Sequence, residues 1–472
     1  MNLRESSAVD LQNQWIDTRW LRRFVWIAFA WRMLISSLTV VPGRDAVNYL
    51  WMSERFLDGD SASALGEVFP PGWSLLMAPF VSLAQWIGLE AFRGAQLANA
   101  ILGALSVWPI LRCAERFGPS VLRLIGWLLV FAPLSVKFGA EALSEPSAQL
   151  FLGLGLWAGL GGRSLAAGLF TAVAFAIRPE ALALGLALTL ARPKAAPWLL
   201  LPSALVVVAL GYWRQSCGYG FEPIPKFGFH DRYDLGAFTG ESIDWSLLAN
   251  NVWRLPFLFV EALQGLGVLA LCGVYLGFRR RRVRVPITAL LFASVAICGF
   301  IAKRRFFVPW LPAVVVLATY ALRRLPATWR LAIFTPAMIF SVLAGLDPQP
   351  DDRWAERTVG RHLGSLLEPG QTVTGDQTRV VYFAGCRPLP PRHYDADEIV
   401  GWARDESVQF VVLTHYGRTE SISERVREDL NGEFTTLPMP EDVRSAAEWR
   451  RLIILRRIEK DIEEDAAEPD DR

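Results

Sequence analysis

The feature that most constrains this chain is a long series of apolar segments. A helix needs about 20 predominantly apolar residues to cross the hydrocarbon core of a bilayer. About eleven segments approach that length: Phe24–Val41, Ala95–Leu111, Val121–Val136, Pro146–Leu160, Ser164–Ile177, Ala181–Ala191, Ala196–Tyr212, Pro256–Phe278, Val285–Ala302, Phe306–Leu322 and Leu331–Leu346. Because hydrophobic residues fill 52% of 472 positions, a soluble fold could not cover this surface. The sequence predicts an all-α polytopic membrane domain.

One further apolar segment, Phe69–Leu89, decides the topology. It contains Pro70, Pro71 and Pro79 and lies between two polar stretches. Lys and Arg collect in short cytoplasmic loops, and if the segment crossed the membrane, the basic run Arg279–Arg282 would be exported. We therefore expect it to lie along the outer leaflet as a juxtamembrane helix. The N-terminus is then cytoplasmic, and the one strongly basic turn outside is Lys303–Arg305.

Composition changes after Leu346 and divides the chain into three predicted parts. Residues 1–346 form the membrane domain, 347–458 a small extracytoplasmic α/β domain, and 459–472 an acidic disordered tail. In the second part the patterns predict three helices and three strands. The helices are Trp354–Leu367, Ala396–Asp405 and Ser421–Leu430, and the strands are Val380–Phe383, Phe410–Thr414 and Leu452–Leu455.

Charged residues gather where the predicted topology places the outer membrane surface. Asp45 follows the first span, and later outside turns contribute Glu141 with Glu145, then Arg178, then Lys303, Arg304 and Arg305. A carboxylate beside several cations at one leaflet suits chemistry on a phosphorylated lipid. The alternative is structural, with Asp45 capping a helix and the cations snorkelling to lipid head groups. Charge placement alone leaves both interpretations open.

Several motifs occur in an informative order along the same region. They are Phe69-Pro-Pro-Gly-Trp-Ser-Leu-Leu-Met-Ala-Pro-Phe, the stretch from Ala100 to Cys113-Ala-Glu-Arg-Phe-Gly, Phe131-Ala-Pro-Leu-Ser, Glu141-Ala-Leu-Ser-Glu-Pro, Arg178-Pro-Glu, and Lys303-Arg-Arg-Phe-Phe-Val-Pro-Trp-Leu-Pro. Together they resemble the C-type (GT-C) polytopic membrane glycosyltransferases, which include the protein O-mannosyltransferases and the lipid A aminoarabinose transferases. Phe69 stands where that family usually has His, and all four histidines of this chain lie elsewhere.

The resemblance implies an enzyme that transfers a sugar from a polyprenyl-phosphate donor to an acceptor on the outer face of the membrane. It implies that Asp45 is the general base, because an acceptor hydroxyl is a weak nucleophile until its proton is removed. Fixed cations would stabilise the leaving phosphate, and Lys303, Arg304, Arg305 and Arg178 are the candidates, with Glu141 and Glu145 as further substrate-binding residues. One carboxylate acting as a base would invert the anomeric centre.

Partners and location follow from the same expectations. They are a lipid-linked sugar donor, a glycan, lipid or protein acceptor, and the lipids of a bacterial inner (cell) membrane. A net charge of only +2 gives no basic excess for nucleic acid. No cofactor is indicated with certainty, and a divalent metal stays open. The alternatives are a polytopic transporter, which predicts repeated halves and midplane charges, or a polysaccharide ligase or polymerase that handles lipid-linked sugars.

Overall fold

The computed structural model describes residues 18–66, 68–223, 238–239, 242–280, 283–299, 302–346, 351–388, 394–416 and 419–458. The chain divides into two compact units, Met1–Pro348 and Gln349–Arg472. The predicted acidic tail 459–472 and Arg281 and Arg282 of the basic run lie outside the described residues. We describe each unit by itself.

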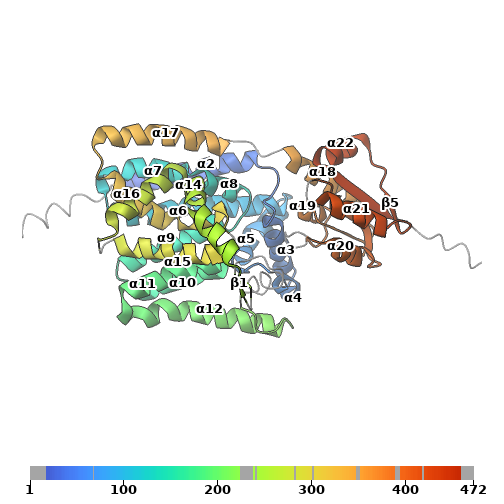
Figure 1. The fold of residues 1–472 in the computed structure, drawn as a ribbon, viewed down its shortest axis with the longest axis horizontal. Helices are drawn as coiled ribbons and strands as arrows, with labels where there is room; N and C mark the ends of the chain where they lie inside the picture. Colours follow the sequence, from blue (N-terminus) through green and yellow to red (C-terminus); the bar gives the residue numbers. More distant parts are fainter. Residues whose placement is uncertain are drawn as a thin grey trace, which may run out of the picture. The chain divides into compact units, whose positions relative to one another are not determined.

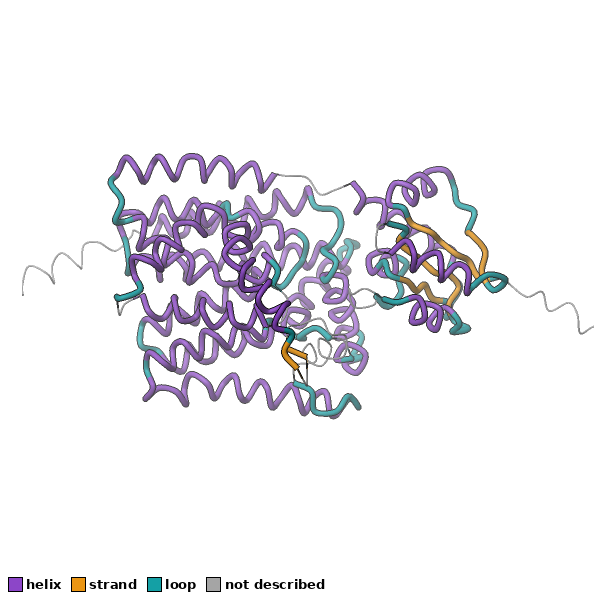
Figure 2. The backbone as a smooth tube through the Cα atoms, viewed as in Figure 1, coloured by secondary structure: helices purple, strands orange, loops and turns teal. Residues whose placement is uncertain are grey.

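The first unit is a helical bundle whose long helices run roughly side by side (Figure 1). Its elements are α2 Thr18–Leu38, α3 Ala46–Leu57, α4 Ser61–Leu65, α5 Gly72–Trp86, α6 Ala91–Glu115, η1 Pro119–Val121, α7 Leu122–Val130, α8 Pro133–Ala140, α9 Glu145–Leu160, α10 Ser164–Ile177, η2 Pro179–Ala181, α11 Leu182–Ala191, η3 Pro193–Ala195, α12 Ala196–Ser216, β1 Phe238–Thr239, β2 Ser242–Ile243, α14 Trp245–Gly277, α15 Arg284–Gly299, η5 Arg304–Trp310, α16 Leu311–Leu322 and α17 Ala327–Leu346. The tube drawing emphasises how little strand this unit contains (Figure 2). The prediction of a mostly helical domain is confirmed.

Six helical segments among the described residues are long and apolar enough to cross a membrane: Ala91–Glu115, Pro119–Ala140, Pro193–Ser216, Trp245–Gly277, Arg304–Leu322 and Ala327–Leu346. Three shorter apolar helices accompany them, over Ser164–Ile177, Pro179–Ala191 and Arg284–Gly299. The predicted number of about eleven crossings is therefore supported only in part. The first predicted span becomes α2, which has 21 residues but contains Arg32 within its apolar stretch.

Arg32 is buried inside the bundle, where a charge is costly. Its guanidinium donates to Ser135 Oγ at 3.1 Å, Ser135 donates to Gln149 at 2.9 Å, and Gln149 donates to Ser106 at 2.9 Å. Gly103 leaves the space for it, because a Cβ there would lie 2.6 Å from Arg32 Nε. This polar chain ties α2 to α6, α8 and α9.

Prolines and glycines set where several elements break or meet. The predicted span Val121–Val136 is divided into α7 and α8 at Ala132, because Pro133 disfavours helical backbone in the residue before it. The helix α5 has 15 residues and contains Pro79. Gly72, at its start, lies so close to α10 that a Cβ would come 2.5 Å from the carbonyl oxygen of Ala176.

The second unit contains a four-stranded sheet of order β3-β4-β6-β5, formed by Thr372–Gly375, Val408–Thr414, Leu452–Arg457 and Phe434–Thr436. The strands β3 and β4 are parallel, and β6 is antiparallel to both of its neighbours. Helices α18 Asp351–Leu366, α19 Thr378–Phe383, α20 Ala396–Ala403, α21 Glu420–Asp429 and α22 Glu441–Arg450 accompany the sheet. Buried apolar residues form two clusters, one around Val359 and Phe410 and one around Ile399 and Val411.

One of the predicted strands is wrong. Val380–Phe383 belongs to the helix α19. A short apolar run does not distinguish a strand from a buried helix by its periodicity alone. The helix is favoured here by contact with α18, where Gly360 and Gly364 let the backbone of α19 approach closely.

Candidate active site

Asp45 lies at the start of α3, at the end of the bundle where α3, α4 and α5 gather (Figure 1). It occupies the N-cap position, yet its side chain makes no capping hydrogen bond. Its carboxylate instead forms an ion pair with Arg305. The side chain of Asp45 keeps 14% of its surface exposed and that of Arg305 keeps 22%, so both groups can reach a substrate.

The short helix η5 sets the direction of Arg305. In a 3₁₀-helix successive residues are about 120° apart, so neighbouring side chains diverge. Arg304 extends to Glu261 of α14, with 2.7 Å between guanidinium and carboxylate, and both side chains are 52% exposed. Arg305 extends the other way, to Asp45. The adjacent side chains of Arg304 and Arg305 therefore pair with carboxylates on different helices.

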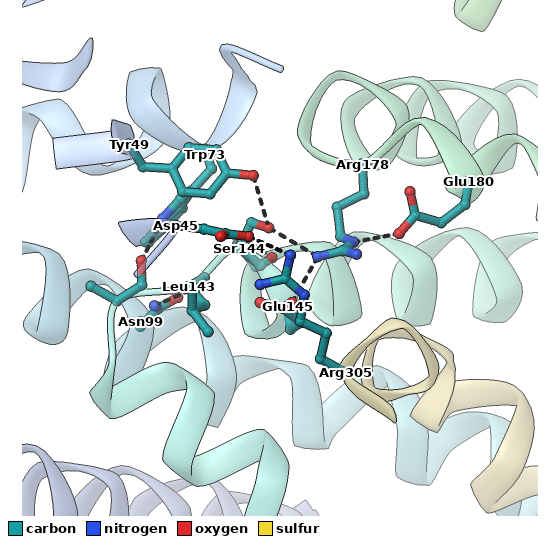
Figure 3. Close-up of polar contacts among 12 residues, drawn as sticks. Asp45, Tyr49, Trp73, Asn99, Leu143, Ser144, Glu145, Arg178, Glu180 and Arg305 are labelled. Atoms are coloured by element: carbon teal, nitrogen blue, oxygen red, sulfur yellow. Dashed lines mark hydrogen bonds and ion pairs between the residues drawn. The ribbon is translucent and has the colours of Figure 1, made fainter. Parts of the chain in front are cut away.

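Arg178 is the second guanidinium of the pocket, and it is almost fully buried (Figure 3). It follows α10, and Pro179 directly after it starts η2. Its Nη1 donates to Glu145 at 2.8 Å and to Ser144 Oγ at 3.2 Å, and its Nε donates to Glu180 at 2.5 Å. Burial lowers the pKa of Arg178, but the two carboxylates more than compensate, so the pKa lies above its usual value. Arg178 stays charged.

Aromatic rings border both guanidiniums. The centroid of the Phe306 ring lies 5.1 Å from Arg178 Cζ and 5.3 Å from Arg305 Cζ, within cation–π range. The buried Tyr49 packs on Phe69 with 5.0 Å between ring centroids, and its hydroxyl lies 3.5 Å from Ser144 Oγ. Burial raises the pKa of Tyr49, which keeps the phenol neutral.

The turn between α8 and α9 places Ser144 and Glu145 in the pocket. Trp73 Nε1 donates to the Ala142 carbonyl at 3.0 Å, and Asn99 Nδ2 donates to the Leu143 carbonyl at 2.9 Å. The turn needs this support because Ala142 adopts a φ of 60°, which costs free energy for a residue with a Cβ. Side chains of α5 and α6 thus position the first residues of α9.

These residues form one narrow pocket, lined by Asp45, Tyr49, Pro70, Leu143, Ser144, Glu145, Ile177, Arg178, Pro179, Glu180 and Arg305. Two of its polar atoms, Glu145 Oε2 and Arg305 Nε, are buried and have no hydrogen-bond partner among the described residues. The pocket therefore keeps one acceptor and one donor unused.

The structure brings four of the seven residues named from the sequence together: Asp45, Glu145, Arg178 and Arg305. Glu141 is buried beside Gly43 and does not line the pocket. Arg304 points to α14. Lys303 is exposed next to the pocket, where partial desolvation and the charge of Arg305 hold its pKa below the usual value although Asp45 opposes the shift.

Sequence reasoning did not name Tyr49 or Ser144 as pocket residues, and it noted Glu180 only as a neighbour of Arg178. Each had a local signal. Tyr49 follows Asp45 by one helical turn and so projects on the same face. Ser144 directly precedes Glu145, and Glu180 lies two residues after Arg178, both within motifs already noted.

The described residues offer one group with metal-binding geometry. His415, Glu420 and Glu424 of the second unit have ligand atoms within 4.8 Å of one another. His415 Nδ1 lies 2.9 Å from Ser423 Oγ. No residue of the narrow pocket belongs to that group, and the pocket itself combines carboxylates with guanidiniums, which suit a phosphate better than a metal ion.

The bundle and its candidate spans define a polytopic membrane protein, with the charged pocket at one end of the candidate span Arg304–Leu322, and the fold is of the GT-C type. Two solved structures of ArnT from Cupriavidus metallidurans share this fold. The structure bound to undecaprenyl phosphate matches with a TM-score of 0.63 and 16% identity, and the apo structure with 0.61 and 15%; each comparison covers 93% of this chain and 98% of the other. ArnT is a lipid A aminoarabinose transferase, so the resemblance seen in the motifs is confirmed for the fold. No family model matches the chain, and no curated protein matches it.

Proposed function

We propose that this protein is an inverting glycosyltransferase that moves a sugar from a polyprenyl-phosphate donor to an acceptor at the outer face of the membrane. The observation that carries the proposal is the contact between Asp45 and Arg305 in one pocket that also holds Arg178. The fold adds support, since ArnT has been solved with undecaprenyl phosphate bound.

Asp45 is the proposed general base. It takes the proton of the acceptor hydroxyl or amine while the acceptor attacks the anomeric carbon, and the bond to the lipid phosphate breaks. The attack comes from the side opposite the leaving group and inverts the anomeric centre. Glu145 is held by Arg178, so it is poorly placed to form a covalent intermediate, which supports a single displacement.

Arg305 and Arg178 are the proposed phosphate ligands. Their guanidiniums provide bidentate donors for the phosphate, which gains a second negative charge as its bond to the sugar breaks. The lining holds three carboxyl groups, those of Asp45, Glu145 and Glu180, beside these two guanidiniums, so the phosphate must compete with carboxylates for the guanidiniums. Lys303, next to the pocket, adds a positive charge that favours binding of the phosphate.

The proposed topology completes this function. We propose about eleven crossings, with the three shorter apolar helices, α2 and α9 crossing as part of the bundle. The N-terminus is cytoplasmic, and the Asp45 pocket and the second unit face outside. The membrane is the inner (cell) membrane of a bacterium, where a lipid-linked donor would meet a glycan, lipid or protein acceptor.

The test is transfer by purified protein in proteoliposomes supplied with a panel of radiolabelled polyprenyl-phosphate sugars. We expect at least one sugar to pass to an added acceptor, with release of polyprenyl phosphate and inversion at the anomeric carbon. Movement of sugar or lipid across the vesicle membrane without a new glycosidic bond would identify a transporter instead. Products that lengthen with time would identify a polymerase.

A further inference from the structure

A second hollow lies at the C-terminal end of α14. It is a broad groove whose lining includes Val274, Tyr275, Phe278, Arg279, Arg280 and Arg324. Its cavity volume is about 860 Å³. Ligand pockets measure about 300–1,000 Å³, so the groove has room for a lipid head group and part of an acyl chain.

The groove lies at the opposite end of a span from the Asp45 pocket. The segment Arg304–Leu322 is a candidate crossing of 19 residues. At about 1.5 Å per helical residue it measures roughly 28 Å, close to the hydrocarbon thickness of about 30 Å. Arg305, near its start, lines the Asp45 pocket, and Arg324, just past its end, lines the groove. The groove therefore lies at the other membrane boundary.

The lining is both basic and apolar. Among the described residues, no acidic side chain lines the groove. Arg324 donates to the Tyr320 hydroxyl at 2.6 Å and lies over that ring, 4.4 Å from the centroid, so one cation is held in place. Tyr275 and Phe278 are 85% and 64% exposed, as expected of aromatic side chains at a bilayer interface.

We propose that this groove binds an anionic phospholipid. Its phosphate would contact Arg279, Arg280 and Arg324, because guanidinium forks match phosphate oxygens, and an acyl chain would lie along Leu271 and Val274. Because the lining is both basic and apolar, a purely polar anion is excluded as the natural occupant: such an anion would leave the apolar wall uncovered. The proposal rests on membrane insertion and not on the proposed transferase activity.

The test uses full-length protein purified in mild detergent and mixed with micelles that contain equal phosphatidylglycerol and phosphatidylcholine. Native mass spectrometry counts the retained lipids. We expect selective retention of phosphatidylglycerol, weakened roughly fivefold by Arg324→Gln and again by a similar factor when Arg279→Gln is added. Arg324→Lys, which keeps the charge, should recover part of the loss.

Arg192→Gln is the matched control, because Arg192 follows α11 at the same membrane boundary but does not line the groove. Its lipid retention should equal that of the wild type. Equal retention of the two lipids, or unchanged retention in the Arg324 and Arg279 variants, would overturn the proposal. So would displacement of phosphatidylglycerol by millimolar inorganic phosphate, which would identify a site for a free anion.

Discussion

The carboxylate of Asp45 is the residue on which the proposed chemistry depends most. Asp45→Asn keeps size and polarity but removes the proton acceptor, so we expect transfer to fall by on the order of a hundredfold or more, with expression and membrane insertion unchanged. Initial rates with saturating donor check this, and donor binding to the same variant is the control. Near-normal rates would remove Asp45 as the base.

The adjacent pair Arg304 and Arg305 provides a built-in comparison. Arg305→Gln removes a guanidinium from the pocket, and we expect turnover to fall, or the donor requirement to rise, by roughly tenfold to a thousandfold. Arg304→Gln breaks only an exposed pair with Glu261, which contributes little. Steady-state kinetics at several donor concentrations separate the two variants. If Arg305→Gln transfers sugar normally, the lipid phosphate is not bound at Arg305, and Arg178 is left as the phosphate ligand.

Glu54 on α3 predicts a pH effect on stability. Burial raises its pKa to about 7 from an ordinary value of 4.5, with Arg55 opposing the shift. The folded protein therefore holds this proton more tightly than the unfolded chain, and stability falls as pH rises from about 4.5 to 7. We expect Glu54→Gln to raise the thermal midpoint at pH 8 but not at pH 5. Glu406→Gln, an exposed control in the second unit, should leave the midpoint unchanged at both pH values.

At the scale of elements, the turn between α8 and α9 positions Ser144 and Glu145 in the pocket. Asn99→Leu removes the donor to the Leu143 carbonyl and leaves a buried acceptor unpaired, at a cost of about 1–3 kcal/mol. We expect a lower thermal midpoint, and a loss of turnover that persists at temperatures where the variant is folded. Asn250→Leu, on an exposed site of α14, is the control. A variant with lower stability but full turnover would mean that the turn does not position Glu145.

The elements also show which features a single sequence can predict. Hydropathy located the helices because a span must be apolar over its whole length, and Pro133 within a predicted span explains the α7–α8 break afterwards. Val380–Phe383 was mistaken for a strand because six residues or fewer do not establish a period. The pairing of Asp45 with Arg305 required tertiary structure: the predicted topology placed both outside, but the direction of Arg305 depends on the 3₁₀ backbone of η5, which no local motif specifies.

At the scale of the whole molecule, the proposed orientation in the membrane makes a direct prediction. Cysteine introduced at Arg280 should be shielded from a membrane-impermeant reagent in intact cells, and cysteine at Gly401, which is exposed and has open space for a Cβ, should react. The background needs Cys272→Ser and Cys217→Ser, since neither native cysteine is buried. Labelling of both introduced positions from the same side would contradict the proposed topology, and permeabilised cells provide the control.

The helix α17 has a consequence for how any of these measurements is made. It lies at the edge of the bundle (Figure 1), only 11% of its apolar window is covered by protein, and Trp329, Phe340 and Leu343 are exposed. Lipid, more than neighbouring helices, therefore sets its tilt, and hydrophobic mismatch costs fractions of a kcal/mol per ångström. The acyl-chain length of the lipid or detergent thus becomes an experimental variable. Rates measured in short-chain detergent and in a bilayer of native thickness come from molecules in which α17 is tilted differently.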